Sequence, residues 1–421
     1  MGLQRSTGGS EERFSAYIDG LASVIGHADR EGPLRDYCTG LVMPGERKSV
    51  EPMAAVTAPA RVSAQHQSLL HFVGVAEWSD EKVLARVRET VLPVMESHGP
   101  IAAWIIDDTA FPKHGKHSVG VARQYCGQLG KQDNCQAAVS LSIANHHASL
   151  PVAYRLYMPK EWASDRKRRK KAGVPGDIKF KTKPKIALDQ IRWACEAGLP
   201  RAPVVMDAGY GADGDLRAKI TGLELTCVAG IRANTVVRVA ADASPDASPD
   251  ASRAASVEKL ALALPKRAWQ KIAWREGTAQ MLASRFARVR VCVAGGAKRR
   301  VDGTPEEWLL IEWPKDEKKP TKYWLSTLPE TIDFAELVDT AKLRWRIERD
   351  YLELKQEIGL GHYEGRGWRG FHHHATLSIA AYGFLISERE SFPPSGSRSR
   401  NLLPRSAIPD GRRPRGAAAQ T

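Results

Sequence analysis

The sequence of 421 residues lacks a long apolar run, paired cysteines and an apolar leader. No stretch approaches the roughly 18 apolar residues of a membrane span, so we expect no membrane partner. The opening residues, MGLQRSTGGSEERF, lack the apolar core of a signal peptide. The six cysteines are scattered without a CxxC pair, which argues against a disulfide framework and a zinc ribbon. These absences predict a cytoplasmic protein with reduced thiols.

Positive charge is what the sequence has in excess. It contains 62 Lys and Arg against 48 Asp and Glu, a formal net charge of +14. A basic surface on this scale favours polyanions, because each phosphate that is neutralised releases counterions. The hydrophobic fraction of 43% is ordinary for a globular protein. We therefore expect a globular, nucleoid-associated protein that binds nucleic acid.

The first half of the chain changes its periodicity near residue 98. Residues 1–97 carry apolar residues at helical spacing and predict a helical domain, which binds DNA or serves packing and dimerisation. Residues 98–235 alternate strand and helix patterns, which predicts an α/β sheet that is parallel at least in part. The main elements expected there are strands at 101–106, 135–143, 151–158, 203–206 and 225–229 and a helix at 185–197.

The second half begins with a break in this pattern. Residues 236–333 combine a low-complexity linker, which includes the repeat ASPDASPD at 243–250, with a small β-rich insertion. Residues 334–390 predict a long helix over 334–358 and an apolar helix over 371–388, the second part of the core. Residues 391–421, with six Arg and one Asp, predict a disordered basic tail.

Two of the apolar runs end in aspartate. The run 101–106 is followed by Asp107-Asp108-Thr109, and the run 203–206 is followed by Asp207. Ligand sites in α/β sheets gather at the carboxyl ends of strands. Carboxylates held there suit two-metal phosphoryl transfer, in which two hard cations lie roughly 3.5–4 Å apart. A single aspartate of this kind is more often a cap or turn residue, but two of them in a basic chain favour a metal site.

A third acid lies in the helical stretch AKLRWRIERDYLELKQE at 341–357. Arg344, Glu348 and Lys355 are spaced i, i+4 and i+11, which places them on one face of a helix. A carboxylate flanked by two cations can supply a metal ligand while the cations hold phosphates. A solvated, salt-bridged helix surface is the alternative interpretation.

These residues resemble the DDE transposases of bacterial insertion sequences, in the cut-and-paste branch whose third acid lies in a Y-x2-R-x3-E-x6-K motif. Arg344, Glu348 and Lys355 fit that spacing in register. Similar stretches are WIIDDTAFPKHGKHSVGVARQYCGQLGKQDNCQ (104–136), MDAGYG (206–211), TKYWLSTLP (321–329) and GLGHYEGRGWRGFHHHATL (359–377). The resemblance covers roughly residues 10–235 and 257–390, more than a short motif matches by chance.

The resemblance implies an RNase H-like mixed sheet flanked by helices, with a β-rich insertion before the acidic helix. It implies that Asp108, Asp207 and Glu348 ligate two Mg2+ ions, with Mn2+ as a possible substitute. The family places its catalytic aspartate directly before threonine, which selects Asp108 over Asp107; the strand pattern alone leaves both open. Arg344 and Lys355 are then expected to bind phosphates.

The same resemblance implies the partners: DNA, as terminal inverted repeats and target, and a second copy of the chain in a homodimeric synaptic complex. Two departures from the family pattern stand out. Ala341 occupies the tyrosine position of the motif, and residues 236–256 are low in complexity where relatives are richer in Pro, Gly and basic residues.

Three further features allow two interpretations each. The run RKRRKK at 166–171 is a phosphate track or a solvated loop, and the net charge favours the first for Arg166, Lys167, Arg168 and Arg169. Trp313 and Trp324 stack on an unpaired base or belong to the core, and short strands favour the core. The three histidines at 372–374 point about 100° apart on a helix and cannot share one ion, so we expect caps or phosphate contacts.

The predicted function is therefore a DNA transposase that cuts and joins element ends. One alternative is an inactive, transposase-derived DNA-binding protein, which the low-complexity stretch favours and the intact triad opposes. The other is a metal-dependent endonuclease without strand transfer. The N-terminal helical part and the insertion argue against that alternative, because plain nucleases need less chain.

Overall fold

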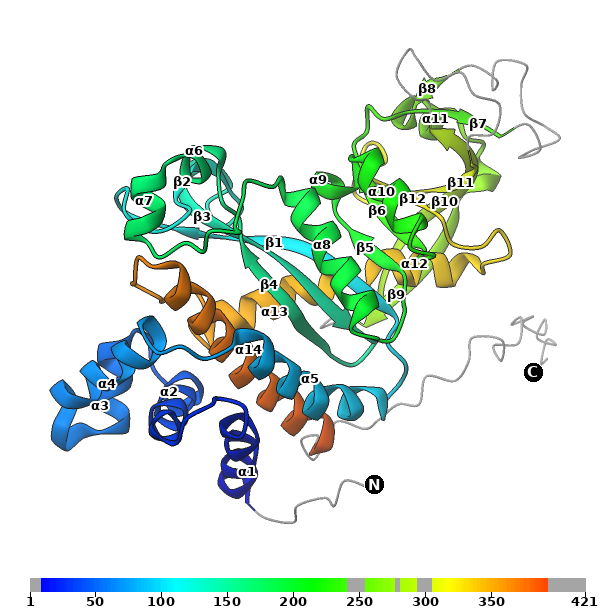
Figure 1. The fold of residues 1–421 in the computed structure, drawn as a ribbon. Coiled ribbons are helices and arrows are strands. Elements are labelled where there is room, and N and C mark those ends of the chain that lie inside the picture. Colours follow the sequence, from blue (N-terminus) through cyan, green and yellow to red (C-terminus); the bar gives the residue numbers. More distant parts are fainter. Residues whose placement is uncertain (1–8, 241–253, 277–280, 294–304, 393–421) are drawn as a thin grey trace, which may run out of the picture.

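The computed structural model describes residues 9–240, 254–276, 281–293 and 305–392 (Figure 1). The predicted repeat at 243–250 and nearly all of the predicted tail lie outside these residues. Within them, the strands form one twelve-stranded sheet in the order β2-β3-β1-β5-β6-β12-β11-β10-β7-β8, with β4 beside β3 and β9 beside β10. Among the described helices none is long and apolar enough to cross a membrane.

The first part of the sheet holds the strands that the sequence pattern indicates, and one more. Its strands are β1 (Ala103–Pro112), β2 (Ala122–Cys126), β3 (Lys131–Ala144), β4 (Ser149–Leu156), β5 (Val204–Met206) and β6 (Cys227–Ile231). β1, β5 and β6 run parallel to one another, whereas β1, β2 and β4 pair with β3 antiparallel. The sheet is therefore mixed, with its parallel centre at β1, β5 and β6.

The predicted β-rich insertion is not a separate sheet. Its strands are β7 (Val236–Val239), β8 (Ala255–Ser256), β9 (Gln270–Glu276), β10 (Met281–Val293), β11 (Glu307–Trp313) and β12 (Lys322–Ser326). β12 pairs antiparallel with β6, so the insertion extends the central sheet and is tied to it by a continuous hydrogen-bond ladder. Trp324 lies in β12 and is 7% exposed, which agrees with the core interpretation.

The two faces of the sheet carry different helices. α8 (Lys183–Glu196) and α10 (Gly214–Thr221) cover one face, where Gln190 of α8 donates to the carbonyl of Val139 in β3. α13 (Trp345–Gln356) and α14 (Trp368–Ser391) lie on the other face, as Figure 1 shows. There the ring of Phe111 in β1 meets the ring of Phe371 in α14. The residues of β1 thus alternate between the α8 side and the α13 side.

The predicted long helix over 334–358 is wrong in one respect, because it is two helices. α12 (Phe334–Lys342) ends before Leu343, and α13 starts at Trp345, with Arg344 as its N-cap. Tight i→i+3 hydrogen bonds from Leu343, Arg346 and Ile347 mark the junction. The break places Arg344, the first charged residue of the predicted motif, at the N-terminus of α13.

The N-terminal residues are helical, as the periodicity indicates. They form α1 (Ser10–Ala22), α2 (Glu31–Val42), α3 (Val50–Thr57), α4 (Val62–Gly74) and α5 (Asp80–Glu96). α1, α2, α4 and α5 pack on α14, and α3 packs on α2 and α4. α14 is buried on nearly all sides and therefore shows no amphipathic stripe. The hydroxyl of Tyr17 donates to the carbonyl of Ala380, and that of Thr376 donates to Asp80, so polar contacts also hold this packing.

The predicted role of the three histidines is wrong. His373 and His374 are each 2% exposed and bond inward: His373 to the carbonyl of Trp78, His374 to the hydroxyl of Tyr37 and the carbonyl of Gly359. His372 is half-buried beside the backbone of Leu156. Burial lowers the pKa of all three, to about 3 for His373 and about 4 for its neighbours. They are neutral core residues that join α14 to its surroundings.

Candidate active site

Asp107 and Asp108 lie in the middle of β1 and point to opposite faces of the sheet. β1 runs on to Pro112, so the expectation that both acids follow the strand end is wrong. The ladder to β3, which pairs Asp107 with Ser140 and Asp108 with Val139, keeps both aspartates extended despite their low strand propensity. The hydroxyl of Ser140 contacts that of Tyr351 in α13 at 2.5 Å. Asp107 therefore faces α13, and Asp108 faces α8.

Asp107 is joined to Glu348 through one guanidinium. Arg344 places Nη2 2.7 Å from Oδ2 of Asp107 and Nη1 2.8 Å from Oε1 of Glu348. The side chain of Asp107 is 12% exposed and that of Glu348 is 65% exposed. The two ion pairs of Arg344 therefore link a buried acid in the sheet to an acid at the surface. Arg344, at the junction of α12 and α13, thus lies between two acids that are 241 positions apart in the chain.

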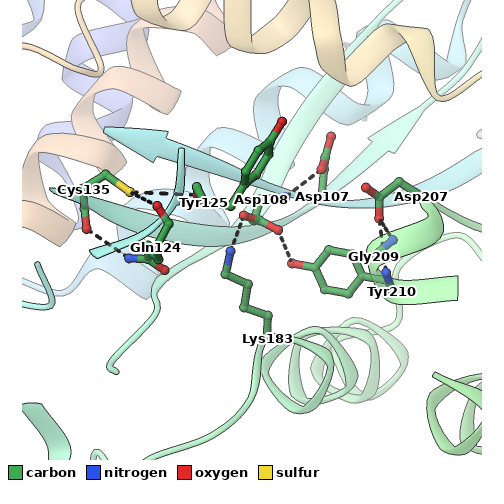
Figure 2. A network of polar contacts seen from close by, with 9 residues as sticks. All are labelled: Asp107, Asp108, Gln124, Tyr125, Cys135, Lys183, Asp207, Gly209 and Tyr210. Atoms are coloured by element: carbon green, nitrogen blue, oxygen red, sulfur yellow. Dashed lines mark hydrogen bonds and ion pairs between the residues drawn. The ribbon is translucent and has the colours of Figure 1, made fainter. Parts of the chain in front are cut away.

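Asp207 belongs to the same cluster. It follows β5 and caps α9 (Ala208–Gly211), where its Oδ1 accepts from the backbone N–H groups of Gly209 and Tyr210 at 2.9 and 3.2 Å (Figure 2). Burial raises the pKa of Asp107 to about 7; Arg344 opposes this shift, and the charge of Asp207 adds to it. Burial alone would lower the pKa of Arg344, but the three carboxylates raise it above its ordinary value.

Asp108, the residue that the family resemblance selects, has both oxygens bound on the other side. Its Oδ2 lies 2.7 Å from Nζ of Lys183, the first residue of α8, and its Oδ1 accepts from the hydroxyl of Tyr210 at 3.1 Å (Figure 2). The structure thus brings Asp107, Asp207 and Glu348 to Arg344, and ties Asp108 to α8 and α9. The alternation of side chains along a strand predicts that Asp107 and Asp108 point to opposite faces of the sheet. It does not predict which of them joins Glu348, because that depends on the face against which α13 packs.

Lys355 also turns toward the sheet. Its Nζ donates to the carbonyl of Ala110 at 3.0 Å and lies 5.3 Å from the ring centre of Phe111. Burial lowers the pKa of Lys355. The ammonium is therefore engaged by β1, the strand that carries Asp107, and its predicted contact with a phosphate stays a prediction.

A cavity of about 660 Å³ opens beside the acids. Asp207, Arg344 and Glu348 form part of its wall, and Trp274, Trp324 and Trp345 supply much of the rest. Ala341 also lines it, so the position that holds tyrosine in the family motif borders this space. The guanidinium of Arg275 lies 4.0 Å from the ring centre of Trp345, which keeps a positive charge in the wall that the insertion provides.

The basic run lies in the short helix α7 (Arg166–Lys171), and its residues divide into two kinds. Arg168 stacks over Trp162 at 3.8 Å and donates to the carbonyl of Lys116, and Arg169 donates to the carbonyls of Ala163 and Pro175. Arg166 and Lys167 are exposed. Of the four residues of this run that were predicted to bind DNA, two support the local fold and two present their charge to solvent.

Asp350 is a buried acid on the helix that carries Glu348, and it makes stability depend on pH. It accepts from Ser149 at 2.5 Å and from Tyr382 at 2.9 Å, and burial raises its pKa to about 7 against the effect of both bonds. An acid whose pKa rises on folding stabilises the fold at low pH, and this contribution is lost as pH rises through about 7. Asp350→Asn should therefore leave stability near pH 4 unchanged and raise it at pH 8 by about 2 kcal/mol.

Urea unfolding of Asp350→Asn and wild type at pH 4 and pH 8, without added metal, measures this effect. Asp316→Asn, on the exposed turn between β11 and β12, is the matched control and should change neither value. A stability difference between Asp350→Asn and wild type that is the same at both pH values would contradict the assignment.

The fold is RNase H-like: a mixed sheet with helices on both faces, in which the central strands and an adjoining helix carry carboxylates. Family comparison agrees. A model described as DDE superfamily endonuclease matches residues 20–281, and one described as transposase DDE domain matches residues 182–384. The chain belongs to the DDE superfamily of endonucleases, and the predicted fold class is confirmed.

One curated protein is similar to part of this chain. The probable transposase for insertion sequence element IS701 of Microchaete diplosiphon is 32% identical to this chain over 174 residues. The match covers 41% of this chain and 42% of the relative, so it spans less than half the length of either protein.

Proposed function

We propose that this chain is a DNA transposase that cuts and joins the ends of an insertion element. The observation that carries the proposal is the convergence of three carboxylates, from β1, the end of β5 and α13, around the guanidinium of Arg344. The family descriptions, which are those of an endonuclease and of a transposase domain, support it.

The donor set fits a hard divalent cation. Asp107, Asp207 and Glu348 offer only carboxylate oxygens, which are the ligands that Mg2+ prefers. Arg344 lies among these acids, which supports a cluster complementary to positive charge. We propose that these three acids hold Mg2+, with Mn2+ as a substitute. Such ions activate the attacking oxygen and stabilise the leaving oxygen of a phosphodiester.

Asp107 takes the place that the sequence prediction gave to Asp108, because its carboxylate is the one on the side of Asp207 and Glu348. Asp108 is proposed to position the site through its contacts with Lys183 and Tyr210. Tyr210 lies in the turn that Asp207 caps, so this contact fixes the backbone that carries the second acid.

Arg344 is proposed to change partners when DNA and cations bind. A cation among the acids would repel the guanidinium and take its partners, which frees Arg344 to hold a phosphate at the wall of the cavity. The DNA substrates are proposed to be terminal inverted repeats and target DNA, and the active form a homodimer. The exposed cations Arg166 and Lys167 are proposed to contact the negatively charged phosphates of the DNA.

The proposal is tested by incubating the full chain with a labelled terminal-repeat duplex and a plasmid target in Mg2+, in Mn2+ and in EDTA. We expect metal-dependent nicking followed by joined products. Cleavage without joined products would point to a plain endonuclease. Binding without cleavage in either metal would point to an inactive DNA-binding protein.

The exposed part of α7 gives a separate prediction about DNA affinity. Replacing Arg166 and Lys167 together by alanine should weaken duplex binding in a sequence-independent manner, because each phosphate contact releases counterions. The slope of log affinity against log salt concentration should fall in magnitude by about 2, one for each charge. Fluorescence anisotropy between 50 and 200 mM salt measures the slope. Lys259→Ala, on α11 (Val257–Ala263), is the control; an unchanged slope in the double variant would exclude α7 from the DNA path.

A further inference from the structure

We propose that His98, His147 and Glu390 form a second metal site, for a borderline divalent transition metal of the Zn2+ class. One donor atom of each residue lies within 4.8 Å of the donor atoms of the other two. This group shares no residue with the acidic cluster around Arg344, so the inference stands whether or not the chain is a transposase.

Three distant segments meet at this point. His98 follows the end of α5, His147 lies in the turn between β3 and β4, and Glu390 is in the last turn of α14. The two imidazole rings are 5.6 Å apart between centres, and Nε2 of His98 is 3.9 Å from Oε2 of Glu390. Ligands of a tetrahedral Zn2+ ion, with bonds of about 2.0–2.1 Å, lie roughly 3.4 Å apart. The donor atoms must therefore move closer when an ion binds, and both histidine side chains are exposed.

A buried asparagine fixes the two histidine segments relative to each other. Asn145 is 1% exposed, and its Nδ2 donates to the carbonyls of Met95 and Gly99, on either side of His98, at 2.8 and 3.0 Å. Its Oδ1 accepts from the backbone N–H groups of His147 and Ala148, both at 2.8 Å. One side chain thus joins the backbones of both segments, so the site is preorganised by the fold and not by the histidines themselves.

Two further contacts hold the segments that carry these ligands. Nε2 of His98 lies 2.9 Å from the carbonyl of Glu390, which keeps the imidazole ring beside the last turn of α14. Arg346 donates to the carbonyl of His147 at 2.6 Å. Arg346 is in α13, between Arg344 and Glu348, so an ion at this position would stabilise the turn that leads into the acidic helix.

The donor set selects the kind of ion. Two imidazoles and one carboxylate suit Zn2+, Co2+ or Ni2+, whereas Mg2+ prefers oxygen ligands alone. The side chain of Glu390 is 14% exposed. Its negative charge would partly compensate the positive charges of the bound ion and of Arg346, and of His146 where that histidine is protonated. Three protein ligands leave a fourth position for water. The bound ion would clip the end of α5 and the β3–β4 turn to α14.

Co2+ absorption and Zn2+ calorimetry on the full chain test the site. We expect one equivalent of Co2+ with visible bands of four-coordinate, nitrogen-ligated metal, displaced by Zn2+, and a rise in melting temperature with Zn2+. His98→Ala and His147→Ala should each weaken Zn2+ binding more than the 10- to 100-fold typical of losing an outer contact. Asn145→Ala, which keeps all three ligands, should fall within that range.

Two controls separate this site from the acidic cluster. His27→Ala changes an exposed histidine beside Asp29 in the N-terminal part and should leave the Co2+ bands intact. The double change Asp107→Asn and Asp207→Asn should also leave them intact. Bands that disappear in that double variant but survive His98→Ala and His147→Ala, or no Co2+ and Zn2+ binding at all, would overturn the proposal. Glu390→Gln serves as a milder variant if circular dichroism shows that a histidine variant fails to fold.

Discussion

Asp107→Asn is expected to abolish cleavage of a labelled element-end duplex, with a loss of at least about a thousandfold. Removing one carboxylate from a two-metal site takes away several kcal/mol of transition-state stabilisation, and about 4 kcal/mol corresponds to a thousandfold in rate. The amide of asparagine has the same shape as the carboxylate, so the ladder between β1 and β3 stays intact. Single-turnover cleavage in Mg2+ measures the effect.

The neighbouring substitution Asp108→Asn is the matched control. Asp108 faces Lys183 and Tyr210, so its amide should loosen α9 and slow cleavage by about tenfold, without removing a metal ligand. Mn2+ binding, followed by electron paramagnetic resonance, provides a readout that does not depend on turnover. It should weaken strongly in Asp107→Asn and little in Asp108→Asn. The reverse order in both measurements would return the β1 ligand to Asp108, as the family pattern implies.

Gly211→Ala should be the most damaging of the small substitutions near the site. A Cβ at Gly211 would lie 2.0 Å from the carbonyl oxygen of Gly230 in β6. The Cβ is fixed by the backbone of α9 and the carbonyl belongs to the backbone of β6, so neither can rotate away. α9 would have to lift from β6 and carry Asp207 with it. We expect a loss of about 3 kcal/mol in unfolding free energy, the upper end for overpacking, and a loss of Mn2+ binding in the protein that still folds.

Gly214→Ala is the matched control for this change, at the start of α10. Its Cβ would meet only the end of Arg217, at 3.9 Å, so we expect stability to be unchanged or raised by about 0.5–1 kcal/mol. Urea unfolding of both variants measures the difference. A Gly211→Ala protein as stable as wild type would mean that α9 is not held against β6 in solution.

Local periodicity was enough to predict most elements of this fold. The helical spacing in residues 1–97, the short run before Asp207 and the amphipathic pattern of α8 each appear where the sequence indicates them. These patterns arise from burial of one face, which a sequence reports directly. The family motif then predicted that Arg344 and Glu348 belong together, and they form an ion pair at 2.8 Å.

What local patterns could not predict depends on packing between distant segments. Asp107 and Asp108 read as a strand end, but the ladder to β3 carries β1 through both. Choosing between them requires the face on which α13 lies, and α13 is more than 230 residues away. The helix break at Arg344 has no glycine or proline to signal it. The burial of His373 and His374 depends on helices that precede them by some 300 positions.

We propose that Glu348, brought to the sheet by α13, completes a site for DNA cleavage and strand transfer. The most direct measurement compares wild type, Glu348→Gln and Glu357→Gln on the same labelled terminal-repeat duplex, with binding followed in parallel. Glu357 ends the same helix, is exposed, and is not part of the cluster around Arg344. We expect nicked and joined products for wild type and Glu357→Gln, and none for Glu348→Gln, which still binds the duplex. Cleavage that survives in Glu348→Gln would contradict a role for this carboxylate in the reaction.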